Sequence, residues 1–142
     1  MLLEPTALAS ALRYLAESLE QDYALDPAPL FAKAGFPRER THQSGARVSQ
    51  RAARHLWELS IAATGDPACG LNVGRHIRPE GLHALGYAWM SSRNLVDAFT
   101  RLCRYAEVLV TIPLNWTLQG EAGGKGQQGR LVANYAWQAT AA

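Results

Sequence analysis

Cysteine is scarce in this sequence, which contains only Cys69 and Cys103 among its 142 residues. Neither stands in a C-x-x-C pair or at a cysteine–histidine spacing, so the sequence indicates neither a redox pair nor a cysteine-based metal site. We therefore interpret both cysteines as small apolar side chains of the core.

Long apolar runs are missing as well. No uncharged apolar stretch approaches the roughly 20 residues that a membrane-spanning helix needs. The sequence begins MLLEPTALASALRYLAESLEQ, which lacks the basic first segment of a signal peptide and contains three glutamates. We therefore expect a cytoplasmic protein with no membrane partner.

The usual signatures of catalysis are absent: the sequence contains no G-x-S-x-G, no H-E-x-x-H and no Walker loop. The glycine-rich segment at 123–129 leads into a strand, where no helix N-terminus can receive a phosphate, and we interpret it as a turn. The carboxylates are scattered over polar helix faces. The histidines have no histidine partner four residues away: His42, His55, His76 and His83. The sequence therefore predicts no enzyme, no cofactor and no metal site.

The net charge of +2 is too small to indicate a nucleic-acid partner. Residues 56–77 resemble a helix-turn-helix superficially, with Gly65 in the turn. The second of these helices, PACGLNV, has no Arg, Lys or Gln to contact base edges. We therefore predict that this chain does not recognise DNA by itself.

Apolar periodicity and helix-ending residues predict a mainly helical chain up to about residue 110. Ser49 and Asn94 are expected N-caps, and Gly35, Gly65 and Gly74 are expected to end helices. The predicted helices cover residues 7–20, a short segment around Leu30 and Phe31, and residues 50–64, 68–73, 79–91 and 95–109.

After Pro113 the apolar period changes from about 3.6 to 2, which is typical of half-buried strands. Two such segments flank the glycine-rich turn and predict an antiparallel hairpin, 114–121 with 130–137. The expected fold class is α+β, in which a mainly helical N-terminal two thirds packs on a small antiparallel β-sheet. Because a lone hairpin is marginally stable, we expect residues beyond this chain to complete the sheet.

Gly86 lies inside the predicted helix 79–91, where glycine costs about 1 kcal/mol relative to alanine. We therefore expect a close approach of another element to this position.

Aromatic side chains gather near the junction of helix and strand. Large rings with a polar edge are typical of small-molecule pockets, but they also fill cores. They are Tyr87, Trp89, Tyr105, Trp116, Tyr135 and Trp137. If a small effector binds, we expect it between the helical layer and the sheet, in contact with some of His83, Tyr87, Tyr105 and Trp116. The alternative, in which these rings only pack the core and His83 faces water, stays open.

Residues 64–109, TGDPACGLNVGRHIRPEGLHALGYAWMSSRNLVDAFTRLCRYAEVL, resemble the N-terminal effector domain of one branch of the AraC/XylS regulators, the arabinose-binding-type domain. The resemblance extends over most of residues 8–137. Its landmarks here are Gly65-Asp66-Pro67, Gly70-Leu71, Gly74, Pro79, Leu85-Gly86-Tyr87, Ser91 to Leu95, and Leu102 to Tyr105. No sugar-binding residue is carried over, because the usual AraC sugar-binding domain is rich in strands and this chain is mainly helical.

The resemblance implies that residues 1–142 are a single regulatory domain, a fragment of a bacterial transcription regulator. A C-terminal helix-turn-helix domain, absent here, would bind promoter DNA, and this domain would control it by sensing an unidentified small-molecule effector. Two alternatives stay open: a module for homodimerisation or other protein interaction without a small ligand, and an enzyme or cofactor-binding domain of unrecognised type. An enclosed cavity lined by Tyr87, Tyr105 and Trp116 favours sensing, whereas an exposed apolar face favours association.

Overall fold

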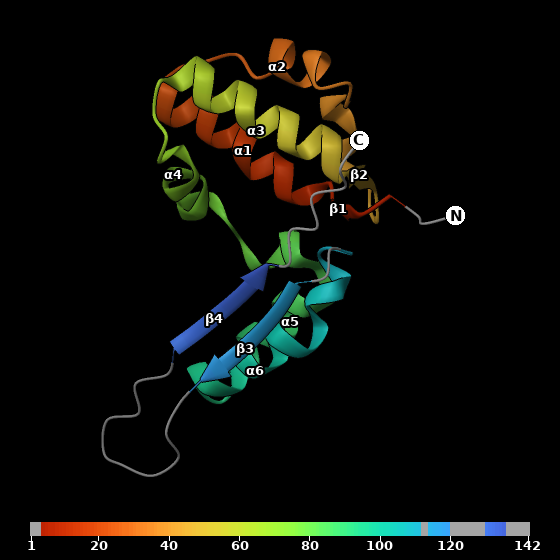
Figure 1. The fold of residues 1–142 in the computed structure, drawn as a ribbon, viewed down its shortest axis with the longest axis vertical. Coiled ribbons are helices and arrows are strands. Elements are labelled where there is room, and N and C mark those ends of the chain that lie inside the picture. The colour runs from red at the N-terminus through yellow and green to blue at the C-terminus, as the bar shows by residue number, and fades with distance from the viewer. Residues whose placement is uncertain (1–3, 112–113, 120–129, 136–142) are drawn as a thin grey trace.

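The structure, a computed structural model, describes residues 4–111, 114–119 and 130–135, and only the backbone of the last two segments. Figure 1 shows a helical N-terminal layer above a smaller layer of two helices and a hairpin. In chain order the elements are β1 (Thr6–Leu8), α1 (Ser10–Tyr23), α2 (Ala28–Lys33), η1 (Arg38–His42), β2 (Arg47–Ser49), α3 (Gln50–Thr64), α4 (Cys69–His76), η2 (Pro79–Leu82), α5 (His83–Met90), α6 (Leu95–Tyr105), η3 (Ala106–Val108), β3 (Leu114–Gln119) and β4 (Arg130–Tyr135).

The core of the N-terminal layer forms around α1. Its apolar residues recur every three or four positions, so one stripe faces α3 and α4 and is buried. Phe31 of α2 and Leu56 of α3 complete this core. The α1 residues buried in it are Leu12, Tyr14, Leu15, Ala16 and Leu19.

The helix ends follow the predicted local chemistry. The Ser49 hydroxyl accepts a hydrogen bond from the Ala52 N–H at 3.2 Å, and Gly65 ends α3 in the left-handed region at φ 67°. The Asn94 side chain accepts from the Asp97 N–H at 2.9 Å and begins α6. These caps are confirmed.

Several predicted helix bounds are wrong. Helix α6 ends at Tyr105 instead of residue 109, and a 3-10 turn follows it; the helix expected over 79–91 is a 3-10 turn followed by α5 from His83. Helix α4 continues through Gly74 to His76, because Gly74 keeps a negative φ and does not form the left-handed end that was expected. The first helix begins at Ser10 instead of residue 7, because Thr6–Leu8 pairs antiparallel with Arg47–Ser49. The sequence pattern did not reveal these two short strands.

Strand β1 joins the two layers. One of its edges pairs with β2, and the other meets the segment after η3: Leu8 N–H donates to the Leu109 carbonyl at 2.9 Å and Thr111 N–H donates to the Thr6 carbonyl at 2.8 Å. Arg47 donates to the Thr6 hydroxyl at 2.6 Å and to the Val108 carbonyl at 3.2 Å. We call these contacts of β1 with residues 108–111 the seam.

The second layer consists of η2, α5, α6 and the β3–β4 hairpin, with β3 against α6 (Figure 1). The hairpin is antiparallel, with Leu114 opposite Tyr135 and Gln119 opposite Arg130. The α+β fold class and the predicted hairpin are confirmed, while residues 120–121 and 136–137 of the predicted strands lie outside the described residues.

Candidate functional site

The four residues predicted to line an effector site lie at different places in the second layer. Tyr87 on α5 and Tyr105 at the end of α6 are 62% and 49% exposed. His83 is partly buried at the start of α5, and Trp116 belongs to β3, where only the backbone is described. The described side chains therefore do not form an enclosed pocket of Tyr87 and Tyr105, and a site there would be open on the α5–α6 side.

Helices α5 and α6 are held together firmly. The Trp89 and Phe99 rings pack edge to face, with centroids 4.9 Å apart and planes at 82°. Arg101 donates to the Ala88 carbonyl at 3.2 Å and pairs with Asp97 at 3.3 Å. Trp89, one ring of the predicted aromatic cluster, is therefore a packing residue.

His83 contacts α1. The ring Nε2 lies 3.5 Å from the Ser10 hydroxyl oxygen, and this buried hydroxyl donates to the Gly81 carbonyl at 2.9 Å. His83 has φ 53° and ψ −137°, a backbone conformation that favours glycine. This strained residue lies where Ser10 of α1 contacts the turn.

Tyr14 is the centre of the contact between α1 and η2. Its buried hydroxyl donates to the Arg78 carbonyl at 3.0 Å and accepts from Arg13 at 3.3 Å. The Arg13 and Arg78 guanidinium carbons lie 5.2 and 5.6 Å from the ring centroid. Arg78 also donates to both carboxylate oxygens of Glu17, at 2.7 and 2.9 Å. We call these contacts, together with those of Ser10, the junction.

At two positions in the second layer, another part of the chain comes so close that only glycine fits. A Cβ on Gly81 would lie 2.6 Å from Tyr14 Cε2, and a Cβ on Gly86 would lie 2.6 Å from the Pro79 carbonyl carbon and closer to its oxygen. The expected close approach at Gly86 is confirmed, and the partner is the backbone of η2.

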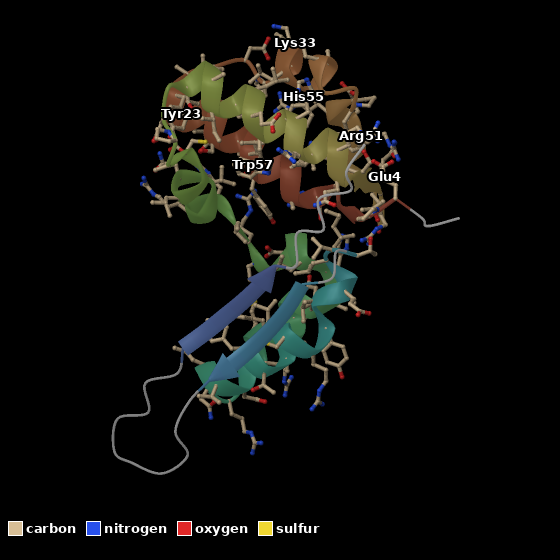
Figure 2. The ribbon with its side chains drawn as sticks, in the orientation of Figure 1. Glu4, Tyr23, Lys33, Arg51, His55 and Trp57 are labelled. Atoms are coloured by element: carbon tan, nitrogen blue, oxygen red, sulfur yellow. The ribbon has the colours of Figure 1, made fainter. Side chains whose placement is uncertain are left out.

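A second polar cluster joins the end of α1 to α4, near the labelled Tyr23 in Figure 2. The Tyr23 hydroxyl donates to Asp66 at 2.6 Å and accepts from the Asn72 amide at 2.7 Å. The hydrogen bond to Asp66 raises the pKa of Tyr23, and the same bond, with that from the Ala68 N–H, lowers the pKa of Asp66. Asp66 therefore fastens the segment before α4 to the end of α1, while α4 itself begins at Cys69 without a side-chain cap.

An adjacent contact strengthens the same attachment. Asp22 accepts from the Ser18 hydroxyl at 2.7 Å and lies 2.8 Å from His76 Nε2. These two hydrogen bonds hold the pKa of Asp22 below its ordinary value, the one from Ser18 having the larger effect. Tyr23, Asp22 and His76 thus attach the α4 segment to the end of α1.

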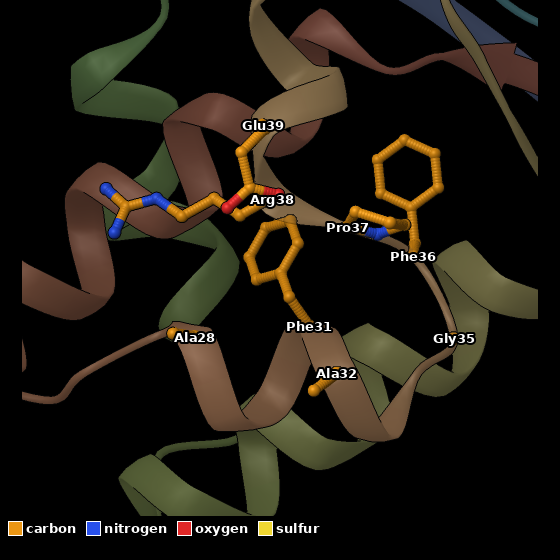
Figure 3. A pocket seen from close by; sticks show the side chains of 8 residues that line it. All are labelled: Ala28, Phe31, Ala32, Gly35, Phe36, Pro37, Arg38 and Glu39. Atoms are coloured by element: carbon orange, nitrogen blue, oxygen red, sulfur yellow. The ribbon is translucent and has the colours of Figure 1, made fainter.

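Two surface hollows lie apart from the predicted site residues. One lies between α2 and η1, where Phe31 and Phe36 are buried and Arg38 is paired with Glu20 (Figure 3). Another surrounds residues 93–100 at the start of α6. Within the described ranges, no three His, Cys, Asp or Glu side chains gather to hold a metal ion.

The comparison with protein families decides the identity of the domain. A family model described as the arabinose-binding domain of AraC transcription regulators, N-terminal, matches residues 25–135. The chain belongs to this family. The match covers α2 through β4, and therefore includes all four predicted site residues, while α1 and its junction residues precede it.

Membership of this family makes the chain a regulatory domain of the AraC type, and the family is not an enzyme class. A comparison with curated proteins found no match. Among the helices that the structure describes, none is long and apolar enough to cross a membrane.

Sequence reasoning missed the junction. Ser10, Tyr14 and Glu17 lie on a helix that was read only for its apolar stripe, and their partners are more than 60 residues away. The Asp66-Pro67 cap was visible in the sequence, but the bond from Tyr23 was not, because nothing local specifies it.

Proposed function

We propose that this domain senses a small-molecule effector and thereby controls DNA binding by the C-terminal domain of an AraC-type regulator. The family match over residues 25–135 is the observation that supports it. The full regulator would contact promoter DNA through its C-terminal domain, and would act in the cytoplasm.

The proposed effector site lies between the α5–α6 pair and the hairpin, with contributions from His83, Tyr87, Tyr105 and Trp116. Two observations support this place. The Trp89–Phe99 contact makes α5 and α6 a rigid surface, and Tyr87 and Tyr105 present their side chains to solvent from that surface. A phenol ring offers contact area at low entropic cost and a hydroxyl that orients a polar ligand.

Single substitutions test this site. Thermal-shift screening against sugars, amino acids and organic acids, L-arabinose included, identifies a ligand, and titration calorimetry then measures its affinity. Tyr87→Phe and Tyr105→Phe remove only hydroxyls, so the affinity should fall by about 3- to 10-fold each, the equivalent of one hydrogen bond, with little loss of stability. Tyr23→Phe is the matched control, because its hydroxyl is engaged at α4, and it should bind as the wild type does.

Self-association is a second candidate function, and one specific observation favours it. Large apolar side chains are exposed together where α5 ends and α6 begins: Tyr87, Met90, Leu95 and Val96. If this face forms a homodimer, Leu95→Glu should shift sedimentation from dimer to monomer. A wild-type protein that is monomeric at all concentrations eliminates this candidate.

A further inference from the structure

The chain breaks between η2 and α5, although the local sequence pattern favours one continuous helix there. Residues 79–91 have the pattern of one continuous helix that begins at Pro79. The structure instead has a 3-10 turn, Pro79–Leu82, followed by a new helix from His83. Apart from Ala24, His83 is the only non-glycine residue at positive φ in the described part of the chain.

The junction holds this break in place. Ser10 donates to the Gly81 carbonyl, Tyr14 donates to the Arg78 carbonyl, and Glu17 accepts from Arg78. All three contacts come from one face of α1 and end on residues 78–81. The Gly81 backbone can reach Tyr14 only because glycine has no Cβ.

The other attachment of the second layer to the first is independent of η2. It is the seam, where backbone hydrogen bonds join Leu8 to Leu109 and Thr6 to Thr111. Loss of the junction would therefore leave the layers connected by the seam and by the chain that runs from α4 into η2, and the second layer would be able to turn about these connections.

We propose that η2 is a latch with two conformations. In the latched form, seen here, residues 78–81 are docked on α1 and His83 is at positive φ. In the released form, the docking contacts are broken, His83 returns to the right-handed helical region, and residues 79–90 form one continuous helix. Release relieves the strain at His83, while docking gains the junction contacts.

The consequence is a change in the position of the second layer. In the latched form η2 is held against α1, α5 packs on η2, and the Trp89–Phe99 contact joins α6 to α5. In the released form the layer that includes Tyr87 and Tyr105 turns about the seam and the chain that runs from α4 into η2. This switch is a property of the fold and does not depend on whether an effector binds there.

Substitutions that favour one or the other of the two conformations test the latch. Gly81→Ala places a methyl group against Tyr14 and should favour the released form. Backbone Cα chemical shifts should then become helical from residue 80 through His83. Hydrogen-exchange protection of Ala84 and Leu85 should rise roughly tenfold, because amides in the first turn of a helix gain carbonyl acceptors when the helix extends. Gly74→Ala is the control, since nothing lies within 4 Å of its added Cβ, and it should leave these signals unchanged.

His83→Gly should act in the opposite direction, because glycine adopts positive φ without strain. It should raise the melting temperature by about 2 °C or more, and it should reverse the shift changes of a weakly released variant such as Glu17→Gln. Three results overturn the latch. They are a Gly81→Ala protein whose His83 shift stays non-helical, a Gly81→Ala protein that loses protection throughout α1 and the seam, and a His83→Gly protein with an unchanged or lower melting temperature.

Discussion

Removal of the Tyr14 hydroxyl tests whether the junction stabilises the domain. Tyr14 is 1% exposed, and its hydroxyl donates to the Arg78 carbonyl at 3.0 Å and accepts from Arg13 at 3.3 Å. Tyr14→Phe keeps the ring between the two guanidinium groups and leaves the Arg78 carbonyl without this donor. The Arg78 carbonyl keeps the hydrogen bond from the Gly81 N–H at 3.0 Å, so we expect the cost of one lost hydrogen bond, about 1 kcal/mol.

The assay is thermal unfolding followed by circular dichroism. For a domain of about this size, 1 kcal/mol lowers the melting temperature by about 2–4 °C, and we expect this shift for Tyr14→Phe. Tyr105→Phe is the matched control, because this side chain is half exposed and its hydroxyl should contribute little. A melting temperature within about 1 °C of wild type for Tyr14→Phe would refute the role assigned to the junction.

Three further predictions concern stability. Gly86→Leu should destabilise the domain by about 1–3 kcal/mol because the side chain meets the η2 backbone, whereas Gly74→Leu should be neutral or slightly stabilising; equal melting temperatures would show that Gly86 is not confined. Ser49→Ala should cost about 1 kcal/mol in urea unfolding through loss of the α3 cap, and an unchanged midpoint would contradict that role. The hydrogen bonds of Asp22 with Ser18 and His76 hold its pKa below the ordinary value in the folded state. Its contribution to stability is therefore complete above the unfolded pKa and is lost as the pH falls through the lower folded value. Asp22→Asn should flatten the acid limb of a stability–pH curve, and an identical limb would show that these two contacts contribute nothing.

Local chemistry accounts for what the sequence could predict. Ser49 and Asn94 cap helices through atoms within three residues, and the alternation after Pro113 needs only the period of a strand. Gly86 was recognisable because a glycine inside a helix has a cost that some close contact must offset. Each of these features lies in a short stretch of chain.

Long-range contacts account for what the sequence could not predict. Strand β1 exists because Thr6–Leu8 meets both β2 and the segment after η3, about 40 and 100 residues away along the chain. The expected helix 79–91 is interrupted at His83, next to the hydrogen bond from Ser10 of α1 to the Gly81 carbonyl. The sequence predicted His83 for the effector site. Its contact with Ser10 could not be predicted, because it depends on how α1 packs beside η2.

Ligand binding by the purified domain tests the central claim most directly. We predict that at least one small molecule in a screen of sugars, amino acids and organic acids raises the melting temperature saturably, with about 2.7 kcal/mol of stabilisation at 100 times its Kd. The shift should shrink in Tyr87→Phe and Tyr105→Phe and persist in Tyr23→Phe. If no compound shifts the melting temperature, and the domain sediments as a dimer that Leu95→Glu separates, the sensing account is wrong and the domain is an association module.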